Sequence, residues 1–197
     1  MNSRKMWIIT FALVALVAPA CRPALADLAV GQTAPAFTLK NLDGTAVSLA
    51  DFKGKPVVLE WINPNCPFSR RHSEAKTMAS TAAKHAEAAW LGINSTNSSH
   101  GDFLSVEKHK EFNAKNGVNY AVLYDSSGEV GRAYGAKTTP HMIIVDKDGK
   151  VAYNGAIDGG AMSGGKNNYV DAALTALADG KVPDPSTTKP YGCSVKY

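Results

Sequence analysis

The stretch that sets the architecture of this chain is Val57-Val58-Leu59-Glu60-Trp61-Ile62-Asn63-Pro64-Asn65-Cys66-Pro67-Phe68-Ser69. Its first half is almost entirely apolar, which is typical of a strand buried on both faces. Pro67 suits the first position of a helix, because its missing N–H costs nothing there. Cys66 therefore lies where a buried strand gives way to a helix, and Arg70 follows one helical turn later. A helix N-terminus and a nearby cation both stabilise a thiolate, so the sequence predicts a reactive thiol; an inert buried cysteine is the alternative.

Strands and helices alternate along the rest of the chain. Residues 37–40 and 46–49 alternate in polarity around Asp43-Gly44, which predicts a hairpin with a tight turn. The other predicted elements are a strand over 56–62, a helix over 67–85, a strand over 86–94, a helix over 106–116, a strand over 120–124, a short helix over 129–134, a hairpin of 141–145 with 151–154, and a helix over 169–177. This order predicts an α/β fold with a central mixed sheet flanked by helices and an N-terminal hairpin extension.

The N-terminal segment has the pattern of a signal peptide. Arg4-Lys5 precedes an apolar run over 6–17 that is too short to span a bilayer, and Ala24-Leu25-Ala26 offers a cleavage site. We therefore expect cleavage after Ala26 and export to the periplasm or another extracytoplasmic compartment. Cleavage before Cys21, which would give a lipoprotein, is the alternative.

Removal of this leader, residues 1–26, leaves a chain of ordinary single-domain size. We expect the domain over 27–179 and a tail over 180–197, rich in Pro, Thr and Lys, that carries Cys193. The formal net charge of +4 belongs largely to the leader, so the charge of the remainder gives no reason to expect nucleic acid as a partner. No stretch after the leader is apolar enough to predict a membrane span.

Several motifs together resemble a known family. They are GQTAPAF at 31–37, FKGKPVVL at 52–59, NCPF at 65–68, GEVGRAYG at 128–135, Thr139-Pro140 before the second apolar strand, and GCSVK at 192–196. Their order resembles the thioredoxin fold, and more closely its redoxin branch, which includes the AhpC/TSA-type peroxiredoxins and exported thioredoxin-like proteins. The resemblance runs from about residue 29 to the C-terminus and implies a thiol-based oxidoreductase.

The resemblance implies roles for particular residues. Cys66 takes the position of the nucleophilic cysteine, and Pro140 takes that of the cis-proline, whose turn would expose the backbone of Thr139 to an incoming peptide or disulfide. Glu60 stands where thioredoxins place a buried acid, which would accept a proton from a leaving thiol. Ser69 stands where thioredoxins have a second cysteine, so the ordinary dithiol pair is missing.

The peroxiredoxin signature is also incomplete. Leu59 and Asn63 replace the proline and threonine that precede the cysteine of that signature, although Asn63 could hydrogen-bond a substrate. As a hypothesis, Cys193 on the tail resolves a mixed disulfide or sulfenate formed on Cys66. A permanent structural disulfide, or a Cys193 that pairs elsewhere, is the alternative.

Three functions are therefore open. The first is an exported thiol–disulfide oxidoreductase that acts on protein thiols or disulfides and exchanges electrons with a redox partner. The second is a peroxiredoxin-like peroxidase whose substrate is a peroxide, and the third is a non-enzymatic binding protein with a structural disulfide. We expect no cofactor.

The histidines are weaker signals. His72 is predicted to lie on the surface, and His85, His100 and His109 are predicted to be solvated. His141 follows the predicted cis-proline and could approach Cys66. Together with Cys193 these residues could form a site for a soft metal, copper in particular, but the spacing of the ligands is poor, so we expect no metal site.

Overall fold

The computed structural model describes residues 28–160 and 167–197. The predicted leader, with Cys21 and the cleavage site after Ala26, lies outside the described residues. Within the two described ranges, every helix is too short or too polar to cross a membrane.

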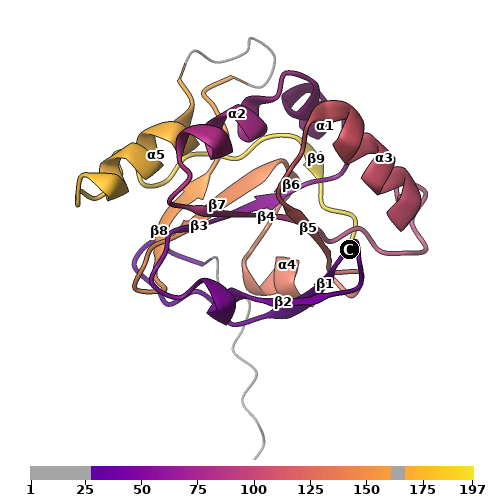
Figure 1. Cartoon of the computed structure of the whole chain (residues 1–197), viewed down its shortest axis with the longest axis horizontal. Helices are drawn as coiled ribbons and strands as arrows, with labels where there is room; N and C mark the ends of the chain where they lie inside the picture. Colours follow the sequence, from indigo (N-terminus) through magenta and orange to yellow (C-terminus); the bar gives the residue numbers. More distant parts are fainter. Residues whose placement is uncertain (1–27, 161–166) are drawn as a thin grey trace, which may run out of the picture.

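A seven-stranded mixed sheet forms the centre of the domain, and a two-stranded sheet lies beside it (Figure 1). The large sheet has the order β2-β1-β5-β4-β3-β7-β8, in which β3 is parallel to β4 and antiparallel to β7. Its strands are β1 (Thr38–Asn41), β2 (Ala46–Ser48), β3 (Val57–Trp61), β4 (Ala89–Asn94), β5 (Ala121–Tyr124), β7 (His141–Val145) and β8 (Val151–Gly155). The small sheet pairs β6 (Thr138–Thr139) with β9 (Cys193–Ser194). The mixed sheet and the N-terminal hairpin are both confirmed.

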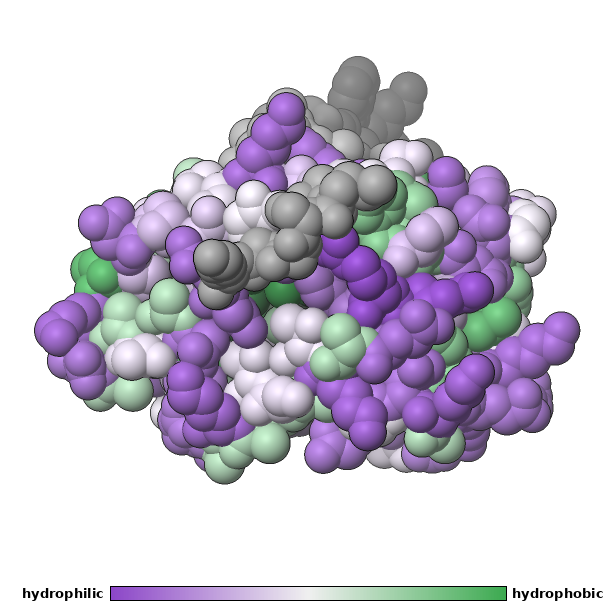
Figure 2. All heavy atoms as spheres, turned by 90° about the horizontal axis from the view of Figure 1, so that it is seen from above, coloured by the Kyte–Doolittle hydropathy of each residue, from purple (hydrophilic) through white to green (hydrophobic). Residues whose placement is uncertain are grey.

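Helices cover both sides of the sheet. Figure 1 shows α1, α2, α3 and α5 above the sheet and α4 below it. The helices are α1 (Pro67–Glu74), α2 (Thr77–Lys84), α3 (Val106–Asn116), α4 (Glu129–Ala133) and α5 (Tyr169–Ala178), with a short 3-10 helix at Leu49–Phe52. The face shown in Figure 2 is mostly hydrophilic, and its apolar side chains form small separate patches.

The predicted single helix over 67–85 was wrong, because the chain breaks it between α1 and α2. Lys76 has a left-handed backbone with φ of 55°. Its N–H bonds the carbonyl oxygen of Ser73 at 2.9 Å, three residues back, and this tightens the turn instead of continuing the α-helix. The break redirects the chain so that α2 packs Met78 into the core.

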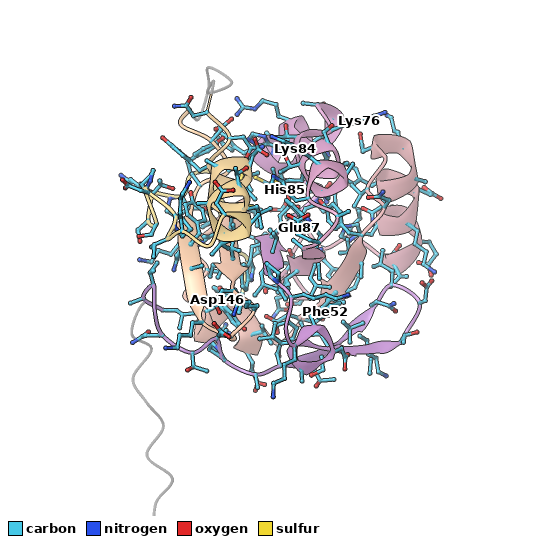
Figure 3. The ribbon with its side chains drawn as sticks, turned by 60° about the vertical axis from the view of Figure 1, so that its left-hand side comes forward. Phe52, Lys76, Lys84, His85, Glu87 and Asp146 are labelled. Atoms are coloured by element: carbon cyan, nitrogen blue, oxygen red, sulfur yellow. The ribbon has the colours of Figure 1, made fainter. Side chains whose placement is uncertain are left out.

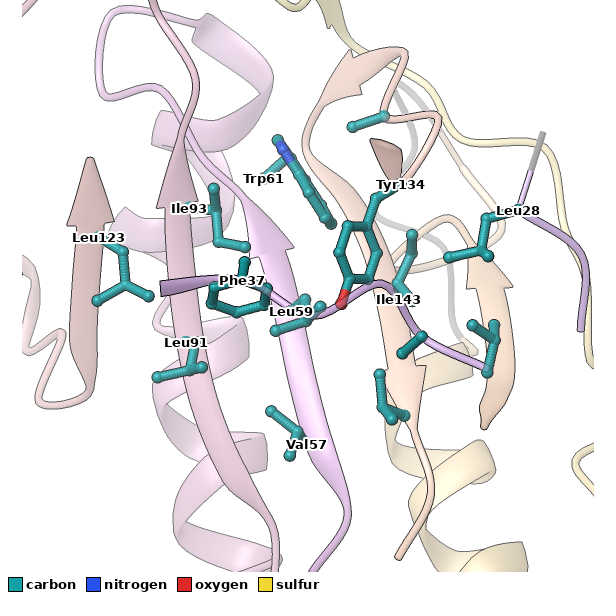
Figure 4. Packing of buried hydrophobic residues seen from close by; sticks show 14 residues of the cluster. Leu28, Phe37, Val57, Leu59, Trp61, Leu91, Ile93, Leu123, Tyr134 and Ile143 are labelled. Atoms are coloured by element: carbon teal, nitrogen blue, oxygen red, sulfur yellow. The ribbon is translucent and has the colours of Figure 1, made fainter. Parts of the chain in front are cut away.

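Two apolar clusters hold the layers together, one on each face of the sheet. Figure 4 shows the first, in which Phe37, Leu59, Trp61 and Tyr134 pack around the middle of β3. The Trp61 and Tyr134 rings lie 5.5 Å apart between centroids. The second cluster joins β3, β7 and β8 to α2 and α5 through Val58, Met78, Ile144, Tyr153, Val170 and Leu174. Because β3 contributes to both clusters, the position of the residues that follow it is fixed from both sides.

Two of the histidines predicted to be solvated are buried. His85 donates from Nε2 to Asp171 at 2.7 Å and lies 3.1 Å from Glu87 through Nδ1, so it ties the end of α2 to α5. Figure 3 shows Lys84, His85 and Glu87 close together at that end. His109 is buried on α3 against Tyr124, and its burial lowers its pKa to about 4. His100 is exposed, as predicted.

The C-terminal tail lies along the domain. Figure 1 shows it crossing from α5 to β9, beside β6. Asn154 on β8 exchanges backbone hydrogen bonds with Ser186 and Thr188, and further along the N–H of Val195 bonds the carbonyl oxygen of Lys137 at 3.1 Å. The hydroxyl of the last residue, Tyr197, donates to the carbonyl oxygen of Ala136 at 2.7 Å. These contacts hold Cys193 at a defined place.

Candidate active site

Cys66 lies at the junction between β3 and α1, as the sequence predicts. It is the N-cap residue of α1, and Pro67 occupies the first turn of that helix. The side chain is buried, with 3% of the residue exposed, and its Sγ donates a hydrogen bond to the carbonyl oxygen of Thr139 at 2.9 Å. The peptide bond between Thr139 and Pro140 is cis, which confirms the conformation that the resemblance implied.

The tail brings Cys193 to this junction. Cys193 pairs with Thr139 in the β6–β9 sheet, and its side chain hydrogen-bonds the sulfur of Cys66. Gly192 allows the approach, because a Cβ atom at this position would overlap the carbonyl oxygen of Thr139. Both cysteines are free thiols. The structure therefore brings together Cys66, Cys193, Thr139 and Pro140, four of the residues that the sequence singled out.

The two thiols differ in acidity. Burial alone would raise the pKa of Cys66, but hydrogen bonds from the side chains of Cys193 and Thr139 and from the backbone N–H groups of Ser69 and Cys193 outweigh it, and the pKa falls below its usual value. For Cys193, burial and then the interaction with Cys66 raise the pKa to about 11. Of the two thiols, Cys66 is therefore the more acidic and Cys193 the one that holds its proton more tightly.

The helix N-terminus contributes to this acidity and Arg70 does not. The N–H of Ser69, in the first turn of α1, is one of the groups that stabilise the Cys66 thiolate. The Arg70 guanidinium donates instead to the carbonyl oxygen of Pro64 at 3.0 Å and to Asn65 at 3.4 Å. Arg70 therefore braces the loop before Cys66 rather than facing its sulfur.

Asn63 is also part of that loop. Its side-chain oxygen accepts from the N–H of Asn65 at 2.7 Å, and its side-chain nitrogen donates to Thr96 at 3.0 Å. The backbone N–H of Asn63 donates to the hydroxyl of Ser69 at 3.5 Å. Asn63 therefore holds the turn that leads into Cys66.

Glu60 is buried on β3 and pairs with Tyr120. The Tyr120 hydroxyl donates to the carboxyl group at 2.6 Å. Burial raises the pKa of Glu60 to about 7, and the hydrogen bond from Tyr120 opposes part of that rise. A carboxyl group with this pKa can take up and release a proton near neutral pH. Tyr120 was not predicted as a partner, because the pairing joins β3 to the residue just before β5, 60 residues later in the sequence.

Sequence reasoning also missed a polar cluster that anchors the tail. His72, predicted to lie on the surface, is buried, and its Nε2 lies 2.9 Å from the hydroxyl of Tyr191. That hydroxyl donates to Asp158, so it accepts from His72 and from Arg71. The only signal in the sequence was the nearness of Tyr191 to Cys193, since the partners come from three separate segments.

His141 does not face Cys66 as a free ligand. Its Nδ1 accepts from the N–H of Lys137 at 3.2 Å, and its Nε2 lies 2.7 Å from the side-chain oxygen of Asn154. Both ring nitrogens are thus used in joining β7 to its surroundings. Across residues 28–160 and 167–197, no group of three or more His, Cys, Asp or Glu side chains is arranged to hold a metal ion.

Comparison with known proteins agrees with this geometry. The model of the AhpC/TSA family matches residues 30–154, which contain Cys66, Thr139 and Pro140. The chain belongs to the AhpC/TSA family. Its architecture is the thioredoxin-like fold, which confirms the fold that the sequence predicted.

Three relatives illustrate the range of similar proteins. Chloroplastic putative peroxiredoxin Q of Oryza sativa subsp. indica is 33% identical over 62% of this chain and 57% of its own length. Thiol-disulfide oxidoreductase ResA of Geobacillus thermodenitrificans is 30% identical over 63% of this chain and 67% of its own. An uncharacterized conserved protein from Geobacillus kaustophilus superimposes with a TM-score of 0.78 at 30% identity, over 86% of this chain and 93% of its own. The chain thus spans under two thirds of the plant relative.

Proposed function

We propose that this AhpC/TSA-family chain is a thiol-based oxidoreductase in which Cys66 is the nucleophile and Cys193 is the resolving thiol. The observation that carries the proposal is the contact between the two thiols beside the backbone of Thr139, in which the pKa of Cys66 is lowered and that of Cys193 is raised. A structural disulfide needs no such difference in acidity between its two cysteines, whereas thiol–disulfide exchange requires one thiolate to attack first.

Thiol–disulfide exchange would proceed in two steps. The Cys66 thiolate attacks one sulfur of a substrate disulfide, forms a mixed disulfide and releases the first substrate thiolate. Cys193 then loses its proton and attacks Cys66, which forms the Cys66–Cys193 disulfide and releases the second thiolate. The substrate gains two electrons and the cysteine pair loses them. Once Cys66 is in a mixed disulfide it carries no charge, so one of the causes that raise the pKa of Cys193 is removed.

Glu60 is the candidate proton acceptor for the resolving step. Its pKa of about 7 suits it to accept a proton and to pass it on at neutral pH. We assign Asn63 and Pro67 the supporting role of fixing the loop and the first turn of α1 around Cys66.

Peroxide reduction is the second candidate, and the similarity to peroxiredoxin Q favours it. The Cys66 thiolate would attack a peroxide oxygen and become a sulfenate, with release of water or an alcohol. Cys193 would then condense with the protonated sulfenic acid to give the same disulfide and one molecule of water. Both candidates end in one oxidised state, which an external thiol must reduce.

We further propose that this chemistry takes place outside the cytoplasm. The pattern of the N-terminal segment supports it, with Arg4-Lys5, an apolar run and Ala24-Leu25-Ala26. The mass of the processed protein tests it, because cleavage after Ala26 gives a chain that begins at Asp27.

Alkylation with peptide mapping tests the central proposal. Protein oxidised with a small disulfide or with hydrogen peroxide should yield a peptide pair joined through Cys66 and Cys193, and this pair should disappear on reduction. Consumption of peroxide that depends on Cys66 would select the peroxidase over the disulfide oxidoreductase. If both thiols stay free after oxidation, Cys193 is not the resolving thiol. If Cys66→Ser alters the melting temperature and leaves the redox turnover unchanged, the binding protein is the better description.

A further inference from the structure

The active-site cysteines are covered by the protein's own tail. The predicted exposure of the Thr139 backbone was wrong, because Thr139 is 5% exposed and pairs with Cys193. Cys66, which contacts both of these residues, is also buried. A proton acceptor inside the protein can serve this pair without displacing β9, so the surroundings of the buried Glu60 matter for the chemistry.

Glu60 points away from the cluster that Figure 4 shows. Leu59, Trp61 and Leu91 belong to that cluster, on one face of the sheet. Side chains alternate along a strand, so Glu60 and its register partner Gly92 on β4 face the other side. The helices α2 and α5 pack against that side.

The lack of a side chain at Gly92 leaves room for Tyr120. A Cβ atom at position 92 would lie 3.1 Å from Val122 and 3.6 Å from the ring of Tyr120, so a larger side chain would take the space of that ring. Tyr120 comes just before β5, passes Gly92 on β4, and donates from its hydroxyl to Oε2 of Glu60 on β3 at 2.6 Å. Its ring also packs against Trp90, with centroids 6.1 Å apart. The hydroxyl is therefore aimed at the carboxyl group by the packing of its ring.

Tyr120 is the titratable group described as acting on the Glu60 carboxyl group. The register partners of Glu60 on the two neighbouring strands, Gly92 and Met142, cannot ionise. Other buried titratable side chains on this face contact different groups. They are His72 on α1, with Tyr191, His85 at the end of α2, with Asp171 of α5, His109 on α3, with Tyr124, and Tyr153 on β8, with Ala156 and Thr188.

We propose that Tyr120 is a positioning residue that holds Oε2 of Glu60, so that the proton of the resolving step is taken up at Oε1. This inference rests on the proposed function and adds the residue that orients the proton acceptor. Cys193 loses its proton to Glu60 and attacks Cys66 as a thiolate. The Cys66–Cys193 bond forms, the bond from Cys66 to the substrate sulfur breaks, and its electron pair leaves on that sulfur. Glu60 then gives the proton, by way of water, to the released thiolate.

The acidities of the two partners agree with these roles. Burial, together with the charge of Glu60 and the hydrogen bond to it, raises the pKa of Tyr120 well above its usual value, so Tyr120 stays a donor at neutral pH. Its hydrogen bond favours the ionised form of Glu60 and opposes the rise in pKa that burial causes. Without the hydroxyl, Glu60 would hold its proton to higher pH, and fewer molecules could accept a proton at neutral pH.

One equivalent of dithiobis(nitrobenzoic acid), an aromatic disulfide, is the probe, used on the reduced full-length protein. Attack by Cys66 releases one coloured thiolate, and closure by Cys193 releases the other, so the second release measures the resolving step. In the unmodified protein its rate should rise with pH through an ionisation at about 7, because ionised Glu60 is the acceptor. In Tyr120→Phe this midpoint should move to higher pH. Closure should then be slower at neutral pH and equal to the unmodified rate above the new midpoint.

Tyr134→Phe is the matched control. Tyr134 is buried and its hydroxyl also donates a 2.6 Å hydrogen bond, to the carbonyl oxygen of Pro35 instead of a carboxyl group, so its removal should leave the midpoint in place. If Tyr120→Phe keeps the unmodified midpoint, or slows closure equally at every pH, the inference is overturned and the proposed function stands. If the unmodified protein gives no second release, the proposed function fails and the inference fails with it.

The infrared absorption of the Glu60 carboxyl group gives a second test that needs no oxidation step. The difference between the unmodified protein and Glu60→Gln isolates this absorption across a pH titration of the reduced protein, and the same subtraction is made in the Tyr120→Phe background. The midpoint should lie at higher pH in Tyr120→Phe, because the donor that favours the ionised carboxyl group is gone. An identical midpoint in the two proteins would contradict the positioning role, whatever the closure rates.

Discussion

The backbone of Gly192 runs so close to Thr139 that a Cβ atom at position 192 would overlap the Thr139 carbonyl oxygen. The same carbonyl oxygen accepts the hydrogen bond from Cys66. One backbone group therefore contacts both the nucleophile and the tail, so we expect the position of the tail to affect how much of Cys66 solvent can reach.

The first prediction concerns alkylation of the reduced protein. Gly192→Ala should speed the reaction of Cys66 with iodoacetamide by about tenfold or more, because displacing the tail should open a residue that is only 3% exposed. The rate is measured by quenched mass spectrometry of the Cys66 peptide. Gly180→Ala also places an alanine at positive φ, but its Cβ atom would meet no neighbouring atom within 4 Å, so it should leave the rate unchanged. Equal acceleration in both variants would mean that general loosening, and not the tail, limits access.

The second prediction separates the hydrogen bond of Cys193 from its sulfur chemistry. Cys193→Ala should raise the pKa of Cys66, because the side chain of Cys193 provides one of the hydrogen bonds that lower it. Cys193→Ser keeps a donor at the same place and should hold the pKa near that of the unmodified protein. The pKa is read from the ultraviolet absorbance of the thiolate. No difference between the alanine and serine variants would show that Cys193 does not stabilise the Cys66 thiolate.

The third prediction is a pH dependence of stability due to Glu60. Its pKa is about 7 in the folded protein, against a usual value of 4.5, so the folded state holds the proton more tightly than the unfolded state. Stability therefore falls as the pH rises from about 4.5 to 7, and the loss is about 3 kcal/mol once the carboxyl group is ionised. Glu60→Gln should remove this slope, as measured by urea unfolding across that pH range.

Glu74→Gln is the matched control for Glu60, because Glu74 is exposed at the end of α1. It should preserve the slope of the unmodified protein. A slope that survives in Glu60→Gln would assign the proton uptake to another group.

The local parts of this structure could be predicted from the sequence, and the long-range parts could not. The junction at Cys66 follows from an apolar run and Pro67, and α3 over Val106–Asn116 was predicted to the residue. The seating of Cys193 on Thr139 depends on contacts between residues far apart in the chain, which no local pattern encodes. For the same reason the burial of His72 was missed, since the partner that buries it comes from the tail.

The last prediction concerns Tyr191 as a positioning residue for Cys193. Its hydroxyl joins His72 and Asp158, and its ring packs edge-on against Phe68 with centroids 6.1 Å apart. Tyr191→Phe keeps the ring and removes the hydroxyl, so the tail should stay folded but hold Cys193 less firmly. We expect the rate at which the Cys66–Cys193 disulfide closes to fall about tenfold, since ring closure depends on the effective concentration of the second thiol.

The rate is followed by quenched alkylation after a pulse of oxidant, and the melting temperature is measured beside it. Tyr124→Phe is the matched control, because Tyr124 also donates a hydrogen bond, to the carbonyl oxygen of Leu104 at 2.7 Å, and the hydrogen-bond partners described for its hydroxyl, Leu104 and His109, do not belong to the tail. If both variants lose stability but close the disulfide at the unmodified rate, Tyr191 has a structural role alone. A slower closure confined to Tyr191→Phe, with the reactivity of Cys66 toward the oxidant unchanged, identifies the hydroxyl as the group that holds the resolving thiol in place.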